Sequence, residues 1–234
     1  MNKANMLYAC GKSKSMYYGE NQNEIVMHFL DSVSSYTQNK NARILGTGIV
    51  RCEVSSVLFD LLNKNGIPTH YKKNIGEGKM LVEKLEMIKL EVIPRNYAAG
   101  SIVRNFPVQY GQKFEPPLLK LDLKYNNDPM LNDDYIVALG IASNKELKVI
   151  KDLAHELNSF LTLFLKQRDI QLVDFKFEVG RRQDGTIVIG DEISPDGMRM
   201  WDVHTLESLD KDVFRFDKGD LVEAYKEVAR RILL

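Results

Sequence analysis

The sequence predicts an α+β fold in which strands and helices occur in separate blocks. Short β-patterned runs dominate the first part of the chain, and amphipathic helical patterns lie at about residues 48–65, 144–168 and 220–233. A doubly wound parallel sheet would instead show strands alternating regularly with helices. The 234 residues are enough for two modest domains, and we expect them to span residues 1–86 and 87–234.

The first block predicts a small antiparallel sheet with one helix. Runs at residues 6–10, 15–18 and 25–29 are separated by Gly11-Lys12 and by a polar stretch, a spacing typical of a meander. The helix at residues 48–65 is expected because apolar side chains recur every three or four positions until Gly66 and Pro68. Further strands are expected at residues 69–72, 80–85 and 87–94.

The second block predicts two helices around a β-hairpin. A loop is expected at Pro116-Pro117, and a polar segment follows at residues 124–129. The long pattern at residues 144–168 and the terminal pattern at residues 220–233 each carry one apolar stripe, which indicates helices that face a core.

The hairpin between residues 173 and 191 brings two carboxylates together. An Asp-Gly pair at 184–185 between β-patterned runs predicts a two-residue loop, which pairs Gln183 with Thr186 and puts Glu178 opposite Asp191. Asp174 and Lys176 share the Glu178 face, and the residues that alternate with them point the other way into a core, namely Val173, Phe175, Phe177 and Val179.

Two carboxylates that face each other across a sheet need a positive charge between them. A divalent cation such as Mg²⁺ bound by one or two carboxylates and substrate phosphates satisfies this need. The alternative is a solvated strand face that Lys176 and Arg182 neutralise. The hairpin alone leaves both interpretations open.

Composition excludes several classes of protein. The chain has 32 basic and 32 acidic residues, so no net field favours nucleic acid or a membrane surface. No apolar run approaches the length of a membrane span, and the N-terminus lacks a signal-peptide pattern, so we expect a cytoplasmic protein. Cys10 and Cys52 are expected to be buried free thiols, and the four histidines lack ligand spacing.

Three short motifs contain residues that suit anionic ligands. Gly11-Lys12-Ser13-Lys14 lacks the first glycine of a P-loop, yet a Gly-Lys turn between strands can cover a triphosphate; an exposed basic turn is the alternative. The segment 95–101 begins with Arg95 and ends with Ala-Ala-Gly-Ser101, just before a helical pattern. This arrangement suits an anion site at the start of the helix, and simple capping of the helix by Ser101 is the alternative. Arg199 follows a Pro-Asp-Gly turn and is a candidate phosphate or carboxylate clamp.

These motifs together resemble the SAICAR synthetases, the phosphoribosylaminoimidazole-succinocarboxamide synthase family. The resemblance also covers the segments 173–178 and 190–202 and runs in order over nearly the whole chain. It implies an ATP-dependent ligase of purine synthesis that joins the carboxylate of CAIR, an aminoimidazole ribonucleotide, to the amine of L-aspartate. It further implies a two-part α+β fold, with a small antiparallel N-terminal sheet domain, a larger α+β domain and a kinase-like ATP cleft between them, and a homodimer.

Site residues follow from the resemblance, motif by motif. The resemblance implies that Glu178 and Asp191 hold Mg²⁺, with Lys176 beside the nucleotide. No general base is evident, and Asp174 and Asp196 are candidates for orientation or proton acceptance. The residues that the resemblance assigns to ATP are Gly11, Lys12, Ser13, Lys14, Met87, Lys124 and Glu178. Those that it assigns to CAIR are Arg95, Ser101 and Arg199.

Two departures from the family pattern leave other functions open. Residues 31–40 lack the usual Gly-Asp-Gly loop, and Asn127-Asp128-Pro129 replaces His-Asp-Pro. A kinase-like phosphotransferase acting on a hydroxyl is one alternative, although the chain has no His-Arg-Asp or Asp-Phe-Gly motif. A nucleotide-binding regulatory protein is the other.

Overall fold

The structure, a computed structural model, describes residues 4–35 and 38–233 and divides them into two compact units. Unit 1 contains the chain up to Leu85, the segment Glu192–Asp196 and the residues from Ser208 onward, whereas unit 2 contains Glu86–Asp191 and Gly197–Glu207. The boundary expected at residue 86 thus lies beside the limit of unit 1. Two later segments nevertheless belong to unit 1, because the terminal helix packs on the first helix of the chain and Glu192 is bonded to Arg51 of that first helix.

Unit 1 is built on an antiparallel sheet. Within its described part, the strand order is β1-β2-β3-β7-β6, so the predicted three-stranded meander at its start is confirmed. A separate pair, β4 and β5, follows β3. The strands are β1 Leu7–Cys10, β2 Lys14–Tyr18, β3 Glu24–Phe29, β4 Ser32–Ser35, β5 Lys40–Arg43, β6 Tyr71–Gly76 and β7 Lys79–Glu83.

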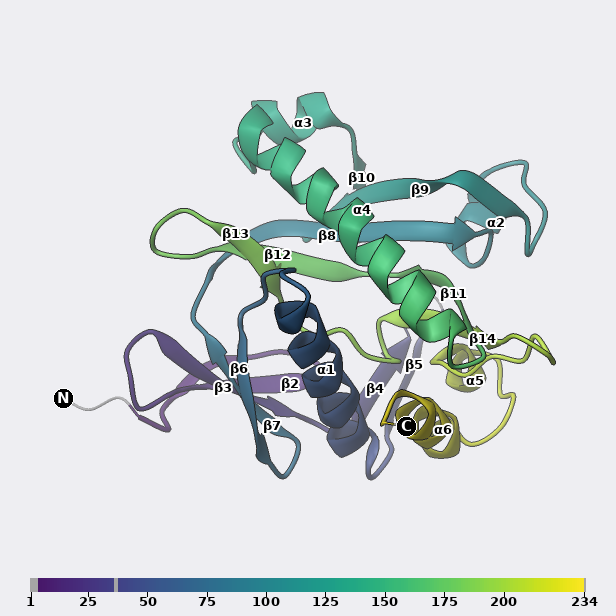
Figure 1. The fold of residues 1–234 in the computed structure, drawn as a ribbon, viewed down its shortest axis with the longest axis horizontal. Coiled ribbons are helices and arrows are strands. Elements are labelled where there is room, and N and C mark those ends of the chain that lie inside the picture. Colours follow the sequence, from purple (N-terminus) through teal and green to yellow (C-terminus); the bar gives the residue numbers. More distant parts are fainter. Residues whose placement is uncertain (1–3, 36–37, 234) are drawn as a thin grey trace. The chain divides into compact units, whose positions relative to one another are not determined.

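Helix α1 (Thr47–Lys64) packs on this sheet, and α6 (Leu221–Leu233) packs on α1, with the short α5 (Asp212–Arg215) before it (Figure 1). A Cβ atom added to Gly48 would lie 2.6 Å from the carbonyl oxygen of Phe29, so glycine is what allows α1 to approach β3 so closely. The carboxylate of Asp31 accepts hydrogen bonds from the N–H groups of Gly46 and Gly48. It therefore caps the N-terminus of α1.

Unit 2 is built on a larger antiparallel sheet. Its described strands follow the order β10-β9-β8-β11-β14, and β12 pairs with both β8 and β13. The bounds are β8 Glu86–Tyr97, β9 Lys113–Leu123, β10 Met130–Leu131, β11 Ile170–Phe175, β12 Phe177–Arg181, β13 Ile187–Gly190 and β14 Met198–Asp202.

Helix α4 (Asn144–Lys166) lies along this sheet and covers β8 and β11 (Figure 1). Leu153, Leu157 and Leu161 face the core as the apolar stripe predicts. The short helices of unit 2 are α2 (Ser101–Asn105) and α3 (Asp133–Ala138). Across both described ranges, none of the helices is long and apolar enough to span a membrane.

Three strand predictions need correction. Strand β8 does not end at Pro94, which lies opposite Leu119, but continues to Tyr97. Pro116 and Pro117 are not a loop but part of β9, at an irregularity in its pairing with β8. The run predicted as one strand from residue 173 is split, since β11 ends at Phe175 and β12 begins at Phe177.

The predicted hairpin register is wrong by one residue. The N–H of Arg182 donates to the carbonyl of Thr186, and Gly185 donates back to Arg182, so the turn is longer than Asp184-Gly185. Glu178 therefore lies opposite Gly190. Asp191 lies beyond the end of β13 and has a φ of 58°.

The capping box of α4 generates a pH-dependent prediction. Glu146 accepts a hydrogen bond from Arg181 and two from Ser143, which lower the pKa of its carboxyl from 4.5 to about 2. A lowered pKa stabilises the fold above the ordinary pKa, and this contribution is lost as the pH falls from 4.5 towards 2. We expect Glu146→Gln to lower the free energy of unfolding at neutral pH and the difference from wild type to vanish near pH 2.

Denaturant unfolding at a series of pH values measures this difference. Glu156→Gln removes an exposed carboxylate from the same helix and is the matched control, which should behave like wild type. A deficit of Glu146→Gln that stays constant with pH would contradict the assignment.

Candidate active site

Three carboxylates form a row across neighbouring strands of unit 2. Glu91 on β8 lies opposite Asp122 on β9 and opposite Glu178 on β12. Each is less than one-tenth exposed. Cross-strand neighbours share a face about 5 Å apart, where like charges are unfavourable, so this row needs cations.

Lysines supply those cations. The ammonium of Lys120 donates to Asp122 at 2.5 Å, that of Lys124 to Glu178 at 2.6 Å, and that of Lys176 to Glu91. Partial burial lowers the pKa of Lys176, but the nearby charges of Glu91, Glu178 and Asp191 outweigh it and leave the pKa raised. Lys176 therefore stays charged beside the row.

Asp191 completes the acidic end of the row. It follows Gly190, which lies opposite Glu178, and its charge acts on Lys176. Its left-handed backbone is one that aspartate tolerates better than most residues. Among the residues that the structure describes, no three His, Cys, Asp or Glu side chains form a complete metal site. One or two carboxylates with phosphate oxygens are the usual ligands of Mg²⁺, and Glu178 and Asp191 are residues of that chemical type.

A second row on the same sheet contains two arginines and an aspartate. Asp174 on β11 lies opposite Arg95 on β8 and next to Arg199 on β14. The Arg199 guanidinium donates to both Asp174 oxygens at 3.1 and 3.0 Å, and Nε of Arg95 lies 3.1 Å from the same carboxylate. Because Glu91 and Arg95 are four residues apart on β8, the two rows occupy one face, as predicted for Asp174 and Glu178.

The Arg95-Asp174-Arg199 row has more positive than negative charge. Arg95 is 5% exposed. Burial lowers its pKa, Asp174 raises it, and the nearby Arg199 lowers it again. A buried guanidinium next to a second one favours an anionic ligand that both can bind.

Gly100 is close to Arg199. It has a φ of 65°, and an added Cβ would lie 2.6–2.9 Å from the guanidinium atoms of Arg199. Ser101 begins α2, but no side-chain hydrogen bond caps this helix of five residues. The capping alternative for Ser101 is therefore not observed, and α2 is too short for its dipole to make an anion site. Met87, the proposed neighbour of adenine, is 40% exposed on β8.

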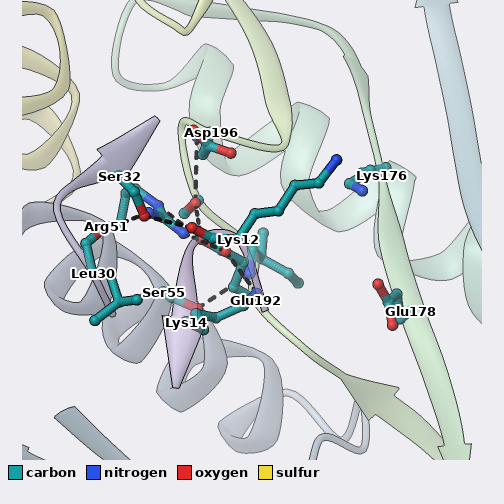
Figure 2. A network of polar contacts seen from close by, with 12 residues as sticks. Lys12, Lys14, Leu30, Ser32, Arg51, Ser55, Lys176, Glu178, Glu192 and Asp196 are labelled. Atoms are coloured by element: carbon teal, nitrogen blue, oxygen red, sulfur yellow. Dashed lines mark hydrogen bonds and ion pairs between the residues drawn. The ribbon is translucent and has the colours of Figure 1, made fainter. Parts of the chain in front are cut away.

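In unit 1, the turn between β1 and β2 presents the predicted lysines. The N–H of Gly11 donates to the carbonyl of Lys14 at 2.8 Å, and the Ser13 carbonyl accepts from Leu30. The side chain of Lys12 is exposed, whereas that of Lys14 is only 12% exposed. Lys14 extends from β2 to the carboxylate of Glu192, with an Nζ to Oε1 distance of 2.7 Å (Figure 2).

Glu192 is the centre of a buried network (Figure 2). Besides Lys14, its carboxylate accepts hydrogen bonds from Nη2 and Nε of Arg51, at 2.6 and 3.2 Å, and from the hydroxyl of Ser194. Burial raises the pKa of Glu192, but Arg51 and Lys14 more than offset this effect and leave the pKa well below its usual range. Arg51 is fully buried on α1 and stays charged.

Asp196 lies in unit 1, whereas the other predicted orienting carboxylate, Asp174, lies in unit 2. The Asp196 carboxylate accepts from Lys211 at 2.8 Å and from the hydroxyl of Tyr225 at 3.2 Å. Burial raises the pKa of Tyr225, which therefore stays protonated as the donor. These contacts anchor the Ser194–Gly197 turn to the C-terminal part of the chain.

Sequence reasoning missed Glu91, Asp122, Arg51 and Glu192. Arg51 carried a signal: an arginine among the buried positions of an amphipathic helix needs a buried partner. Glu91 and Asp122 carried none, because their proximity to Glu178 depends on which strands pair.

Comparison with known proteins identifies the family. The SAICAR synthetase family model matches residues 7–232. Phosphoribosylaminoimidazole-succinocarboxamide synthases of Methanoculleus marisnigri and Methanopyrus kandleri are 48% and 45% identical over the whole chain, which covers 97% and 95% of those proteins.

Solved structures agree. One described as a SAICAR synthetase in complex with ADP has a TM-score of 0.92 and 42% identity, with 96% of each chain covered. The phosphoribosylaminoimidazole-succinocarboxamide synthase of Ehrlichia chaffeensis has a TM-score of 0.94 and 34% identity, with 97% of this chain and 98% of that one covered. The α+β fold expected from the resemblance is confirmed, and the chain belongs to the SAICAR synthetase family.

Proposed function

We propose that the chain is an ATP-dependent ligase of purine biosynthesis that joins CAIR to L-aspartate and forms SAICAR, ADP and phosphate. The family match across residues 7–232 is the observation that carries this function. The relative solved with ADP supports nucleotide binding. The phosphotransferase and regulatory alternatives are not favoured, because full-length relatives carry the ligase name.

The chemistry is a carboxyl activation. A carboxylate is a poor electrophile because its oxygen does not leave, so the γ-phosphoryl group of ATP is transferred to the CAIR carboxylate. The aspartate amine then attacks the carbonyl carbon, the carbon–oxygen bond to phosphate breaks, and the amine loses a proton as the amide forms. The protein orients the reactants and stabilises the transferred charge.

CAIR binds at the Arg95-Asp174-Arg199 row. Two guanidiniums suit its phosphate or carboxylate, and Ser101 adds a hydroxyl at the start of α2. Asp174 accepts hydrogen bonds from Arg199 and forms an ion pair with Arg95. Its role is therefore to orient the two arginines rather than to accept a proton. Asp196, held by Lys211 and Tyr225, has a structural role in its own turn.

ATP binds with its phosphates at the Gly11-Lys12-Ser13-Lys14 turn, and unit 1 covers them. Lys12 and Lys14 supply charge, and the family resemblance assigns Met87 and Lys124 to the nucleotide as well. Glu178 and Asp191 would hold Mg²⁺, which when bound neutralises phosphate charge and polarises the transferred group. Lys176, kept charged by the neighbouring carboxylates, stabilises negative charge on the phosphates.

Further properties are proposed with the function. Cys52 is buried as expected, whereas Cys10 is exposed, so the expectation of two buried thiols is wrong for Cys10. Two free thiols suit a reducing compartment, and we place the protein in the cytoplasm. The family resemblance supports a homodimer, which light scattering on the purified protein tests.

One assay tests the function. Protein, MgATP, CAIR and aspartate are mixed, and ADP is followed together with SAICAR absorbance. ADP formation that requires both CAIR and aspartate is expected. ADP formation without incorporation of aspartate would contradict the ligase, as would nucleotide binding without turnover.

Asp191→Asn tests the proposed metal carboxylate. Asparagine tolerates the left-handed backbone at this position, so the fold should persist while kcat falls by about 100-fold or more. Steady-state kinetics and thermal unfolding measure the two effects. Asp184→Asn, in the turn of the same hairpin, is the matched control and should keep wild-type kcat; wild-type turnover in Asp191→Asn would refute the assignment.

Gly100→Ala tests the CAIR site through Arg199. The new methyl group must displace the guanidinium, so we expect KM for CAIR to rise about tenfold or more while KM for ATP changes little. Gly111→Ala is the matched control, because Gly111 also has a positive φ but has no atom within 4 Å of an added Cβ. Equal kinetic effects of the two variants would show that backbone strain, and not Arg199, is responsible.

A further inference from the structure

The ammonium of Lys14 is held by a carboxylate that is itself held from the opposite side. Arg51 contributes two hydrogen bonds to Glu192 and a third, of 3.3 Å, to the carbonyl of Leu30. One turn further along α1, the hydroxyl of Ser55 accepts the N–H of Ile193 at 3.1 Å. Helix α1 thus fixes the backbone next to Glu192 as well as its carboxylate.

The charges within this group do not cancel, and their sum is positive. Lys14, Glu192 and Arg51 together carry two positive charges and one negative charge. The bidentate, fully buried Arg51 compensates Glu192, so the positive charge of Lys14 is not cancelled by its own partner. Asp196, the next carboxylate, is paired with Lys211.

We infer that Glu192 and Arg51 are positioning residues for the nucleotide: Glu192 holds the Lys14 ammonium at the Gly11-Lys14 turn, and Arg51 keeps the charge of that ammonium available to a polyphosphate. The inference rests on the proposed binding of ATP phosphates by Lys14. It extends the phosphate site from the turn into α1 and the Glu192–Ser194 segment, neither of which has the sequence of a phosphate loop.

A purely structural role for the same residues makes a different prediction. A buried ion pair that only holds unit 1 together affects stability, and its removal should affect every ligand alike. A positioning pair acts through Lys14, so its effect on phosphate binding disappears once Lys14 is gone.

A double-mutant cycle separates these roles. Dissociation constants for MgADP and for adenosine are measured by calorimetry on wild type, Lys14→Met, Glu192→Gln and the double variant, with thermal unfolding recorded for each. We expect Lys14→Met and Glu192→Gln each to weaken MgADP binding about tenfold, with adenosine binding nearly unchanged. The double variant should bind MgADP no more weakly than Lys14→Met.

Three results would overturn the inference. MgADP affinity could be unchanged in Glu192→Gln despite a lower melting temperature, or the two losses could multiply in the double variant. Unchanged affinity in Lys14→Met would remove the phosphate role of Lys14 itself, whereas ligase turnover by the wild type would still support the proposed function. If Glu192→Gln does not fold, the cycle is run with Glu192→Asp. Aspartate keeps the negative charge, but its side chain is one methylene shorter and holds the carboxylate further from Lys14.

Substitutions at Arg51 test the charge argument by rescue. Arg51→Met leaves Glu192 to cancel Lys14, so MgADP binding should weaken by a factor similar to that in Glu192→Gln. Arg51→Lys restores the charge without the bidentate geometry and should recover most of the affinity. Equal MgADP affinities in Arg51→Met and Arg51→Lys would contradict a role for the charge of Arg51.

Discussion

The burial of Glu192 is the constraint on which unit 1 depends. A carboxylate that is 8% exposed is costly unless it is paired and fully hydrogen bonded. Here α1 supplies Arg51, β2 supplies Lys14, and the adjacent turn supplies Ser194. Because these donors come from segments far apart in the sequence, the same interaction that stabilises the charge also holds the Glu192–Asp196 segment within unit 1.

The two units share one electrostatic arrangement. In unit 1, Glu192 lies between Lys14 and Arg51; in unit 2, Asp174 lies between Arg95 and Arg199. A carboxylate between two cations reduces their mutual repulsion and fixes their geometry, yet it leaves one positive charge in excess. Such preorganised charge stabilises an anion without further rearrangement, which suits a reaction whose substrates carry phosphates and carboxylates.

Periodicity predicted the helices well, because an apolar stripe of 3.6-residue period is local information. Helix α4 begins at Asn144 as expected, after the capping box of Ser143 and Glu146. Motif order likewise indicated the family and its candidate residues. The partners of those residues could not be predicted: Glu91 lies beside Glu178 only because β8 pairs with β12, and Arg51 binds Glu192 across 141 positions of sequence.

The one-residue error in the hairpin shows why register matters more for the site than for the fold. Moving the register exchanges the faces of a strand, so the predicted Glu178-Asp191 pair becomes Glu178 opposite Gly190. The next residue, Asp191, has a left-handed backbone and lies beyond the end of β13. The carboxylate that Glu178 directly faces is Glu91. The acidic character of the site therefore comes from pairing within the sheet, and the hairpin adds Asp191 at its edge.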